Sequence, residues 1–251
     1  MVFKTPGEVE LMDEANRIVH EVLDLMAVAV APGVTTKALD TMAEEHIRAA
    51  GGVPAFLNYR GFPATLCTSI NDVIVHGIPN EQPLRAGDIV GIDCGVLFKG
   101  YYGDAARTFA VGAISAEAEL LMRTTRESLD KAVAAMQPGR FLSDIGHAVE
   151  QHVCARGLAV VREFVGHGIG TSLHEDPQVP NFGKPGKGPR LRAGLVLAVE
   201  PMVNVGSPDV RVDADGWTAR TCDGSLSAHF EYSIAVTESG ARVLGRMSEA
   251  A

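Results

Sequence analysis

Residues 17–51, RIVHEVLDLMAVAVAPGVTTKALDTMAEEHIRAAG, return at residues 123–157 as RTTRESLDKAVAAMQPGRFLSDIGHAVEQHVCARG. When the chain is shifted by 106 positions, eleven of the 35 aligned pairs are identical. Average residue usage gives chance identity at about 6% of positions, or roughly two pairs. The chain therefore contains an internal repeat. The identical pairs are Arg17/Arg123, Glu21/Glu127, Leu23/Leu129, Asp24/Asp130, Ala29/Ala135, Pro32/Pro138, Gly33/Gly139, Glu44/Glu150, His46/His152, Ala49/Ala155 and Gly51/Gly157.

Each copy of the repeat predicts two helices joined by a Pro-Gly turn. The turns are Pro32-Gly33 and Pro138-Gly139, and each copy closes on a glycine where a helix commonly ends. Apolar residues recur at helical intervals before each turn. These residues are Leu11, Ile18, Val22 and Leu25 in the first copy, and Leu121, Leu129, Val133 and Met136 in the second.

Strand patterns follow each helix pair. The predicted strands are 89–97, 102–111, 159–165, 195–205 and 227–237, the first two forming a hairpin around Lys99-Gly100. A helix pair followed by antiparallel strands, twice over, predicts an α+β fold with pseudo-two-fold symmetry. We expect one domain spanning 1–251, with halves at approximately 1–112 and 113–251. The helices should cover one face of a curved sheet, and a site should lie between the halves.

The composition is that of a globular protein, with 46% hydrophobic and 21% charged residues. The formal net charge of −9 argues against DNA or a membrane as the main partner. Neither a signal peptide nor an apolar stretch of about 18 residues is evident. The four cysteines include no C-x-x-C pair and predict neither a disulfide framework nor a thiolate zinc site. We expect a cytoplasmic monomer.

Five potential metal ligands lie on or beside the predicted strands: Asp93, Asp104, His167, Glu200 and Glu231. Asp93 and Asp104 occupy the two arms of the hairpin, where adjacent strands can bring both carboxylates to one point. His167 lies within GHGIG, whose glycines allow the backbone to approach a ligand closely. Glu200 ends an apolar run, and Glu231 alternates with Phe230 and Tyr232 and so faces the other side of its strand.

Taken singly, each carboxylate is better explained as a strand-edge residue or a member of a surface ion pair than as a metal ligand. Together, buried carboxylates repel one another and need a neutralising partner. Arg107, beside Asp104, is the nearest cationic candidate in the sequence. Divalent cations are the simpler explanation, and four carboxylates with one imidazole suit Mn, Fe(II), Co or Zn. Bridging carboxylates would hold two ions about 3.5–4 Å apart, with a shared water as nucleophile.

Five segments resemble type I methionine aminopeptidases, and the likeness extends over nearly the whole chain. They are CTSINDVIVHGIP (67–79), GIDCGVLFKGYYGDAARTFAVG (91–112), VGHGIGTSLHEDPQVPNF (165–182), VLAVEPMVN (196–204) and SLSAHFEYSIAVT (225–237). The resemblance implies the pita-bread fold and removal of the initiator methionine from nascent polypeptides whose second residue is small. It also implies that the five ligands hold two divalent ions.

The same resemblance implies individual roles. Asp93 would bind one metal and His167 the other, Asp104 and Glu231 would bridge, and Glu200 would be both ligand and general base. His76 would lie near the scissile amide nitrogen, and His174 would hydrogen-bond the carbonyl oxygen. The substrate's methionine side chain would be held by Tyr59, Phe62, Cys67, Leu173 and Trp217, with Phe56 as a further candidate.

Three positions depart from the family pattern. Type I enzymes usually carry His at the position of Tyr102, often His at that of Tyr232, and commonly Gln at that of His229. We expect these residues to surround the metal ligands, so that the departures affect metal preference and pH optimum.

Two rival functions and one docking surface remain open. An Xaa-Pro aminopeptidase or prolidase would share the five ligands, and a non-enzymatic binding protein would share the fold alone. The loop NFGKPGKGPRLRAG carries Lys184, Lys187, Arg190 and Arg192 on an otherwise acidic chain. This 184–192 loop is either an ordinary solvated segment or a contact to the polyanionic ribosome surface.

Overall fold

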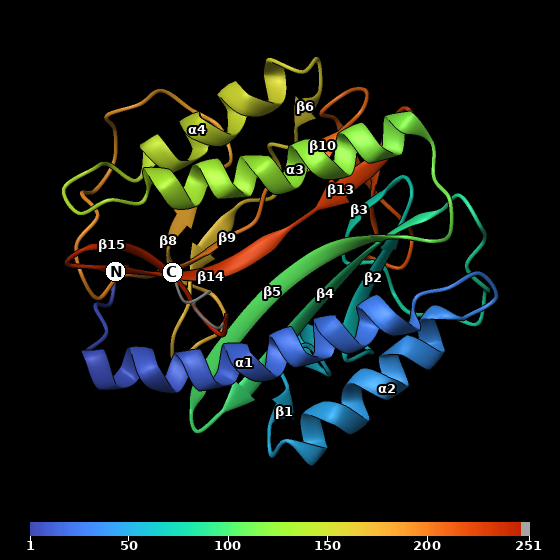
Figure 1. Cartoon of the computed structure of the whole chain (residues 1–251), viewed down its shortest axis with the longest axis horizontal. Helices are drawn as coiled ribbons and strands as arrows, with labels where there is room; N and C mark the ends of the chain where they lie inside the picture. Colours follow the sequence, from blue (N-terminus) through green and yellow to red (C-terminus); the bar gives the residue numbers. More distant parts are fainter. Residues whose placement is uncertain (247–251) are drawn as a thin grey trace.

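The computed structural model describes residues 1–246 and shows helices covering one face of a curved antiparallel sheet (Figure 1). The helices are α1 (Pro6–Ala29), α2 (Thr36–Ala49), α3 (Ala116–Ala135) and α4 (Ser143–Cys154), with a short 3-10 helix η1 (Tyr59–Gly61). Thr5 begins α1 with a capping box, in which its side chain accepts from the Glu8 amide and Glu8 accepts from the Thr5 amide. The four helices and the turns at Pro32-Gly33 and Pro138-Gly139 confirm the prediction from the repeat.

The repeat gives the two helix pairs the same packing. Glu21 on α1 lies 3.2 Å from His46 on α2, and Glu127 on α3 lies 2.9 Å from His152 on α4. All four residues belong to identical pairs of the repeat. The sequence similarity between the halves therefore corresponds to an equivalent contact between the helices of each pair.

The main sheet places the two halves edge to edge. Its order is β1-β4-β5-β14-β9-β7-β8, with β2 also paired to β4 and β15 to β14. These strands are β1 (Val53–Pro54), β2 (Leu66–Ile70), β4 (Ile89–Phe98), β5 (Tyr101–Ala110), β7 (Gly166–Gly168), β8 (Glu175–Val179), β9 (Val196–Val199), β14 (Glu231–Thr237) and β15 (Gly240–Val243). The hairpin of β4 and β5 matches the prediction, and β5 pairs with β14 across the junction of the halves.

Two small sheets flank the main one. The first contains β6 (Ala159–Val160), β10 (Met202–Asn204) and β13 (Ser227–His229). The second contains β3 (Val73–Val75), β11 (Val210–Val212) and β12 (Ala219–Thr221). In the first of these sheets β13 contacts β4, and in the second β3 of the first half pairs with β12 of the second.

Three predicted strands need correction. The 195–205 strand is divided into β9 and β10 at Glu200-Pro201, because proline has no amide hydrogen for the ladder. The 227–237 strand is divided at Phe230 into β13 and β14, which pair with different sheets. The 159–165 strand is wrong beyond residue 160. Val161 and Phe164 pack into a buried cluster from irregular backbone, so their apolar character reflects burial rather than strand pairing.

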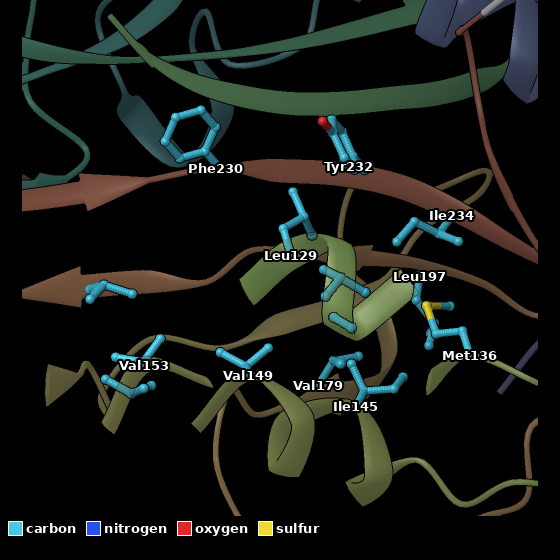
Figure 2. Packing of buried hydrophobic residues seen from close by; sticks show 14 of the residues in the cluster. Leu129, Met136, Ile145, Val149, Val153, Val179, Leu197, Phe230, Tyr232 and Ile234 are labelled. Carbon is cyan, nitrogen blue, oxygen red and sulfur yellow. The ribbon is translucent and has the colours of Figure 1, made fainter. Parts of the chain in front are cut away.

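The core of the second half lies between its helices and the sheet. Figure 2 shows Leu129 from α3, Met136 directly after α3 and Val149 from α4 directed toward the strands that carry Leu197 and Ile234. A separate buried cluster fills the equivalent space in the first half, beneath α1 and α2. Because helices cover one face, the opposite face of the main sheet is left for the candidate ligands. Within residues 1–246, none of the helices is long and apolar enough to cross a membrane.

Candidate metal centre and substrate pocket

A row across three strands brings two of the candidate ligands together. Ala106 on β5 is the register partner of Asp93 on β4 and also of Glu231 on β14. Register partners project from the same face of a sheet, so both carboxylates flank the small alanine side chain. Asp104 is two residues from Ala106 on the same strand and therefore shares this face. Three carboxylates from both halves thus converge.

Close helix packing sets the position of Asp104. Gly103 lies so near α1 that an added Cβ would come within 2.7 Å of the Asn16 backbone nitrogen. The Asn16 side-chain oxygen accepts from the Asp104 amide at 3.2 Å, and the Ser233 hydroxyl donates to the Asp104 carbonyl at 2.9 Å. The backbone of Asp104 is therefore held from α1 and from β14.

His167 stands between two strands that approach unusually closely. A Cβ on Gly166 would lie 2.3 Å from the Ala198 carbonyl oxygen, and one on Gly168 would lie 2.4 Å from the Asp176 carbonyl oxygen. The His167 Nδ1–H donates to the Gly168 carbonyl at 2.9 Å, which leaves Nε2 without a proton. An unprotonated imidazole nitrogen backed by such a hydrogen bond is typical of a metal-ligating histidine.

Glu200 reaches the same point from the end of β9. The side-chain amide of Asn181 donates to the Glu200 backbone carbonyl at 2.9 Å and holds the backbone where β9 stops. Its Oε1 lies 3.6 Å from His167 Nε2, and Asp104 Oδ2 lies 3.9 Å from the same nitrogen. All five predicted ligands are therefore brought together, and Asp104, His167 and Glu231 offer ligand atoms within 4.8 Å of one another.

The donor set fits divalent cations. Asp93 Oδ1, Asp104 Oδ1 and Glu231 Oε1 are buried and have no hydrogen-bond partner among the described residues. Arg107 does not neutralise Asp104, because it faces the other side of β5 and binds Asp24 at 2.6 Å. Buried carboxylate oxygens without donors are costly unless a cation binds them.

Protonation is the alternative to a bound cation. Burial raises the pKa of Asp93 to about 7. Burial, together with the neighbouring carboxylates, raises the pKa values of Asp104, Glu200 and Glu231 well above their ordinary range. Without cations this cluster therefore retains protons near neutral pH, and bound cations would displace them.

A cavity of about 190 Å³ opens beside these carboxylates. The residues predicted for the methionine pocket line it: Tyr59, Phe62, Cys67, Leu173 and Trp217, with Phe56 and Arg60 in addition. The Phe62 and Trp217 rings meet edge to face with centroids 5.2 Å apart. Cys67 is the register partner of Asp93, so one strand pair joins the pocket wall to the metal cluster. The cavity is apolar on one side and rich in carboxylates on the other.

Both predicted substrate histidines line this cavity. His76 takes a left-handed conformation with φ of 60°, and Phe164 packs edge to face against its ring at 5.3 Å. The next residue must be glycine, because a Cβ on Gly77 would lie 2.2 Å from the Thr68 carbonyl oxygen. His174 lies beside His167 with ring centroids 4.3 Å apart. Burial lowers the pKa of His76 to about 4 and, with Arg60, lowers that of His174.

The three departures from the family pattern occupy different surroundings. His229 is buried with its Nε2 unpartnered among the described residues, 3.9 Å from both Glu200 Oε2 and Glu231 Oε2. Tyr102 packs with the cluster behind the pocket. The expectation for Tyr232 is wrong, because its ring lies in the core on the helix side of β14. Of the three, His229 is the one whose ring nitrogen faces the cluster of candidate ligands.

Sequence reasoning missed two residues of this site. Ala106 separates the carboxylates, and its role depends on β5 pairing with β14, which local sequence does not reveal. Arg60 stands at the cavity wall in a left-handed conformation, with φ of 50°. Its position between Tyr59 and Gly61, in a stretch rich in turn-forming residues, is the signal that could have identified it.

The basic loop is exposed and lies away from the cluster of carboxylates. Lys184, Lys187 and Arg192 are exposed and have no carboxylate within 4.0 Å among the described residues. Arg190 is partly committed to the fold, because it donates to the Gly139 carbonyl at 2.6 Å and its guanidinium lies over the Phe141 ring. Three charges of the loop therefore remain available for a partner.

Known proteins match this chain closely. The methionine aminopeptidase of Clostridium perfringens is 50% identical over 97% of this chain and 98% of its own length. The crystal structure of methionine aminopeptidase from Thermotoga maritima is 43% identical with a TM-score of 0.97, covering 98% of this chain and 100% of that one. The pita-bread fold with a curved antiparallel sheet, expected from the sequence, is confirmed.

More distant likenesses concern the fold alone. The prolidase from Pyrococcus furiosus has a TM-score of 0.79 at 21% identity, covering 99% of this chain and 66% of that one.

The profile of metallopeptidase family M24 matches residues 10–238. A match of that extent, joined to 50% identity with a curated relative, settles the classification. The chain belongs to metallopeptidase family M24.

Proposed function

We propose that this chain is an aminopeptidase that removes the N-terminal methionine from nascent polypeptides when the second residue is small. The observation that carries the proposal is the joining of an apolar, aromatic-walled cavity to a cluster of buried carboxylates. A thioether side chain suits such walls, through sulfur–aromatic contacts of about 0.3–1.5 kcal/mol. Relatives that share up to 50% identity carry the name methionine aminopeptidase.

Two divalent ions, held by Asp93, Asp104, His167, Glu200 and Glu231, complete the proposal. When bound, they would supply Lewis acidity toward the scissile carbonyl group and a water acidic enough to attack near neutral pH. Mn, Fe(II), Co and Zn all suit this donor set. Because both halves supply ligands, we also propose that the whole chain acts as one catalytic domain.

The remaining roles belong to the protein side chains. Glu200 accepts the proton of the attacking water, since its carboxylate lies at the cluster and its backbone is held by Asn181. His174 donates to the carbonyl oxygen as the carbonyl carbon becomes tetrahedral, and His76 faces the amide nitrogen that leaves. Tyr59, Phe62, Cys67, Leu173 and Trp217 hold the methionine side chain. Exclusion of water from this cavity would strengthen each of these interactions.

The setting of the reaction is part of the same proposal. We place the protein in the cytoplasm as a monomer that meets nascent chains at the ribosome. The exposed charges Lys184, Lys187 and Arg192 would supply salt-sensitive attraction to ribosomal RNA despite the net charge of −9.

Peptidase assays distinguish the proposal from its rivals. The protein is stripped of metal with a chelator, reloaded with single metals, and assayed on Met-Ala-Ser, Met-Phe-Ser and an Ala-Pro peptide. We expect cleavage of Met-Ala-Ser only with metal and little cleavage of Met-Phe-Ser. Preference for the Ala-Pro peptide would instead identify a prolidase-like enzyme. Absence of both activity and bound metal would favour a non-enzymatic binding protein.

A further inference from the structure

Tyr59 and His174 form a hydrogen bond that is not needed to assemble either the cluster of candidate ligands or the walls of the pocket. The Tyr59 hydroxyl lies 2.8 Å from His174 Nδ1, and the two rings are tilted by 30° with centroids 5.4 Å apart. Tyr59 comes from the first half of the chain and His174 from the second. The contact therefore joins the halves at the rim of the cavity.

The turn that carries Tyr59 is strained and closely tied. Asn58 and Arg60, on either side of Tyr59, have φ values of 67° and 50°. Non-glycine residues adopt this region at a cost in free energy and persist there where surrounding contacts fix them. Here the Asn58 amide donates to the Phe62 carbonyl at 2.8 Å, and the Tyr59 amide donates to the Phe56 carbonyl at 2.8 Å. The backbone thus holds the Tyr59 ring at one place.

The chemistry of the two groups decides the direction of the hydrogen bond. A phenol with a pKa near 10 is a stronger donor than a neutral imidazole N–H, and an imidazole nitrogen is a stronger acceptor than a phenol oxygen. The Tyr59 O–H therefore donates to His174 Nδ1. Nδ1 then carries no proton, and a neutral His174 must carry its proton on Nε2.

We infer that Tyr59 is a positioning residue. It fixes His174 in the tautomer that carries its proton on Nε2, the ring nitrogen that does not bind Tyr59. This inference rests on the proposed function, in which His174 donates to the carbonyl oxygen of the substrate. Without the Tyr59 hydroxyl, the other tautomer would become populated, and it presents an acceptor instead of a donor. A carbonyl oxygen that gains negative charge would be repelled by that lone pair.

The test uses Tyr59→Phe, which keeps the ring in the pocket wall and removes the hydroxyl. Loss of one such hydrogen bond should lower kcat for Met-Ala-Ser about 10-fold and change KM by less than about 2-fold. Nitrogen-15 NMR of the zinc-loaded protein reports the tautomer directly, with the His174 signals assigned by their loss in His174→Ala. The wild type should show a protonated Nε2, and Tyr59→Phe should show both tautomers.

A matched control is Tyr101→Phe. The Tyr101 hydroxyl donates to Glu8 at 2.9 Å, away from the cavity, so this variant should keep both kcat and the His174 tautomer. A protonated Nδ1 on His174 in the wild type would overturn the inference. So would a Tyr59→Phe protein with an unchanged tautomer. Full activity of His174→Ala would refute the proposed role of His174, while the NMR spectrum would still report on the hydrogen bond.

Discussion

Lys4 and Glu175 form an ion pair whose side chains are only 3% and 11% exposed. The pair fastens the segment before α1 to the first residue of β8, directly after His174. Gly170 makes room for it, because a Cβ at that position would lie 2.4 Å from Lys4 Cε. The Lys4 amide also donates to the Gly194 carbonyl at 2.7 Å. A residue at the fourth position of the chain therefore supports the geometry of the site.

Replacing Lys4 by methionine should destabilise the protein through its partner. Glu175 would be left as a buried charge without a cation, which typically costs about 3–5 kcal/mol. Urea unfolding of the metal-free protein measures the loss. The double variant Lys4→Met/Glu175→Gln should recover a large part of it, since no unpaired charge remains. An equal free energy of unfolding for Lys4→Met and the wild type would show that the ion pair does not stabilise the fold.

Glu200→Gln should lower kcat for Met-Ala-Ser at least about 100-fold, the usual scale for loss of a general base. The amide side chain would keep the shape of the carboxylate but could not accept a proton. Weaker metal binding would imitate this effect, so the metal content of the assayed sample must be measured as well. An active variant with full metal content would remove Glu200 from the proton transfer.

His174→Ala should lower kcat and kcat/KM together, by about 10²–10³, with little change in KM. This pattern identifies an interaction that forms mainly in the transition state. His76→Ala should lose a similar factor, with a stronger dependence on the residue after the scissile bond. Both variants should bind as much metal as the wild type, whereas His167→Ala should not. Loss of metal from His174→Ala would show that its assigned role is wrong.

The stability of the metal-free protein should fall as the pH rises. The pKa of Asp93 is raised to about 7 from an ordinary value near 3.8, so the folded state binds this proton more tightly than the unfolded state. The resulting stability is present below about pH 4 and is lost as the pH rises through about 7. Between pH 5 and pH 8 the loss should be on the order of 2–3 kcal/mol.

Urea unfolding at several pH values in the presence of a chelator measures this loss. Asp93→Asn keeps the size of the side chain without a titrating group, and it should reduce the pH dependence, while Asp104, Glu200 and Glu231 keep their own contribution. Addition of Mn²⁺ to the wild type should restore stability most at the higher pH, since ions and protons compete for the same carboxylates. A metal-free wild type that is more stable at pH 8 than at pH 5 would contradict the pKa direction.

Reversal of the charges at Lys184, Lys187 and Arg192 should weaken co-sedimentation with ribosomes at low salt about 10-fold or more, and should leave Met-Ala-Ser cleavage intact. Arg190 is left in place because it is bound to Gly139 and Phe141. Reversal at Arg123, Arg126 and Lys131 on α3, which are also exposed, is the matched control. Equal co-sedimentation of the two variants would exclude docking through the loop.

Features that depend on local chemistry could be predicted from the sequence. The helices followed from apolar spacing and the Pro-Gly turns, and the hairpin that carries Asp93 and Asp104 followed from strand patterns around Lys99-Gly100. The sequence shows that Pro201 stops ladder pairing, but the division of 195–205 into two strands and the break at Phe230 were missed, because each apolar run continues from one sheet into another. An apolar pattern records burial and cannot show which strand is the partner.

The same distinction between local sequence and tertiary pairing applies to the candidate site. The five candidate ligands were predicted from residue types and from resemblance, and the structure places these side chains around one cavity. Tyr232 was misjudged because its neighbour Glu231 faces the metal cluster, while alternation along β14 turns the tyrosine toward the helices. Turn-forming residues mark a turn around Tyr59, but its conformation could not be predicted, because Asn58 and Arg60 adopt backbone angles that only the surrounding contacts maintain.

The candidate metal ligands come from both halves of the chain, so bound ions would help to hold the halves together. Asp93 and Asp104 precede the largely exposed connection at residues 113–115, whereas His167, Glu200 and Glu231 follow it. Bound ions would act as a cross-link between two fragments, much as a disulfide does, in addition to the pairing of β5 with β14. A protein cut by a protease at this connection should remain associated at lower concentration with metal than after chelation.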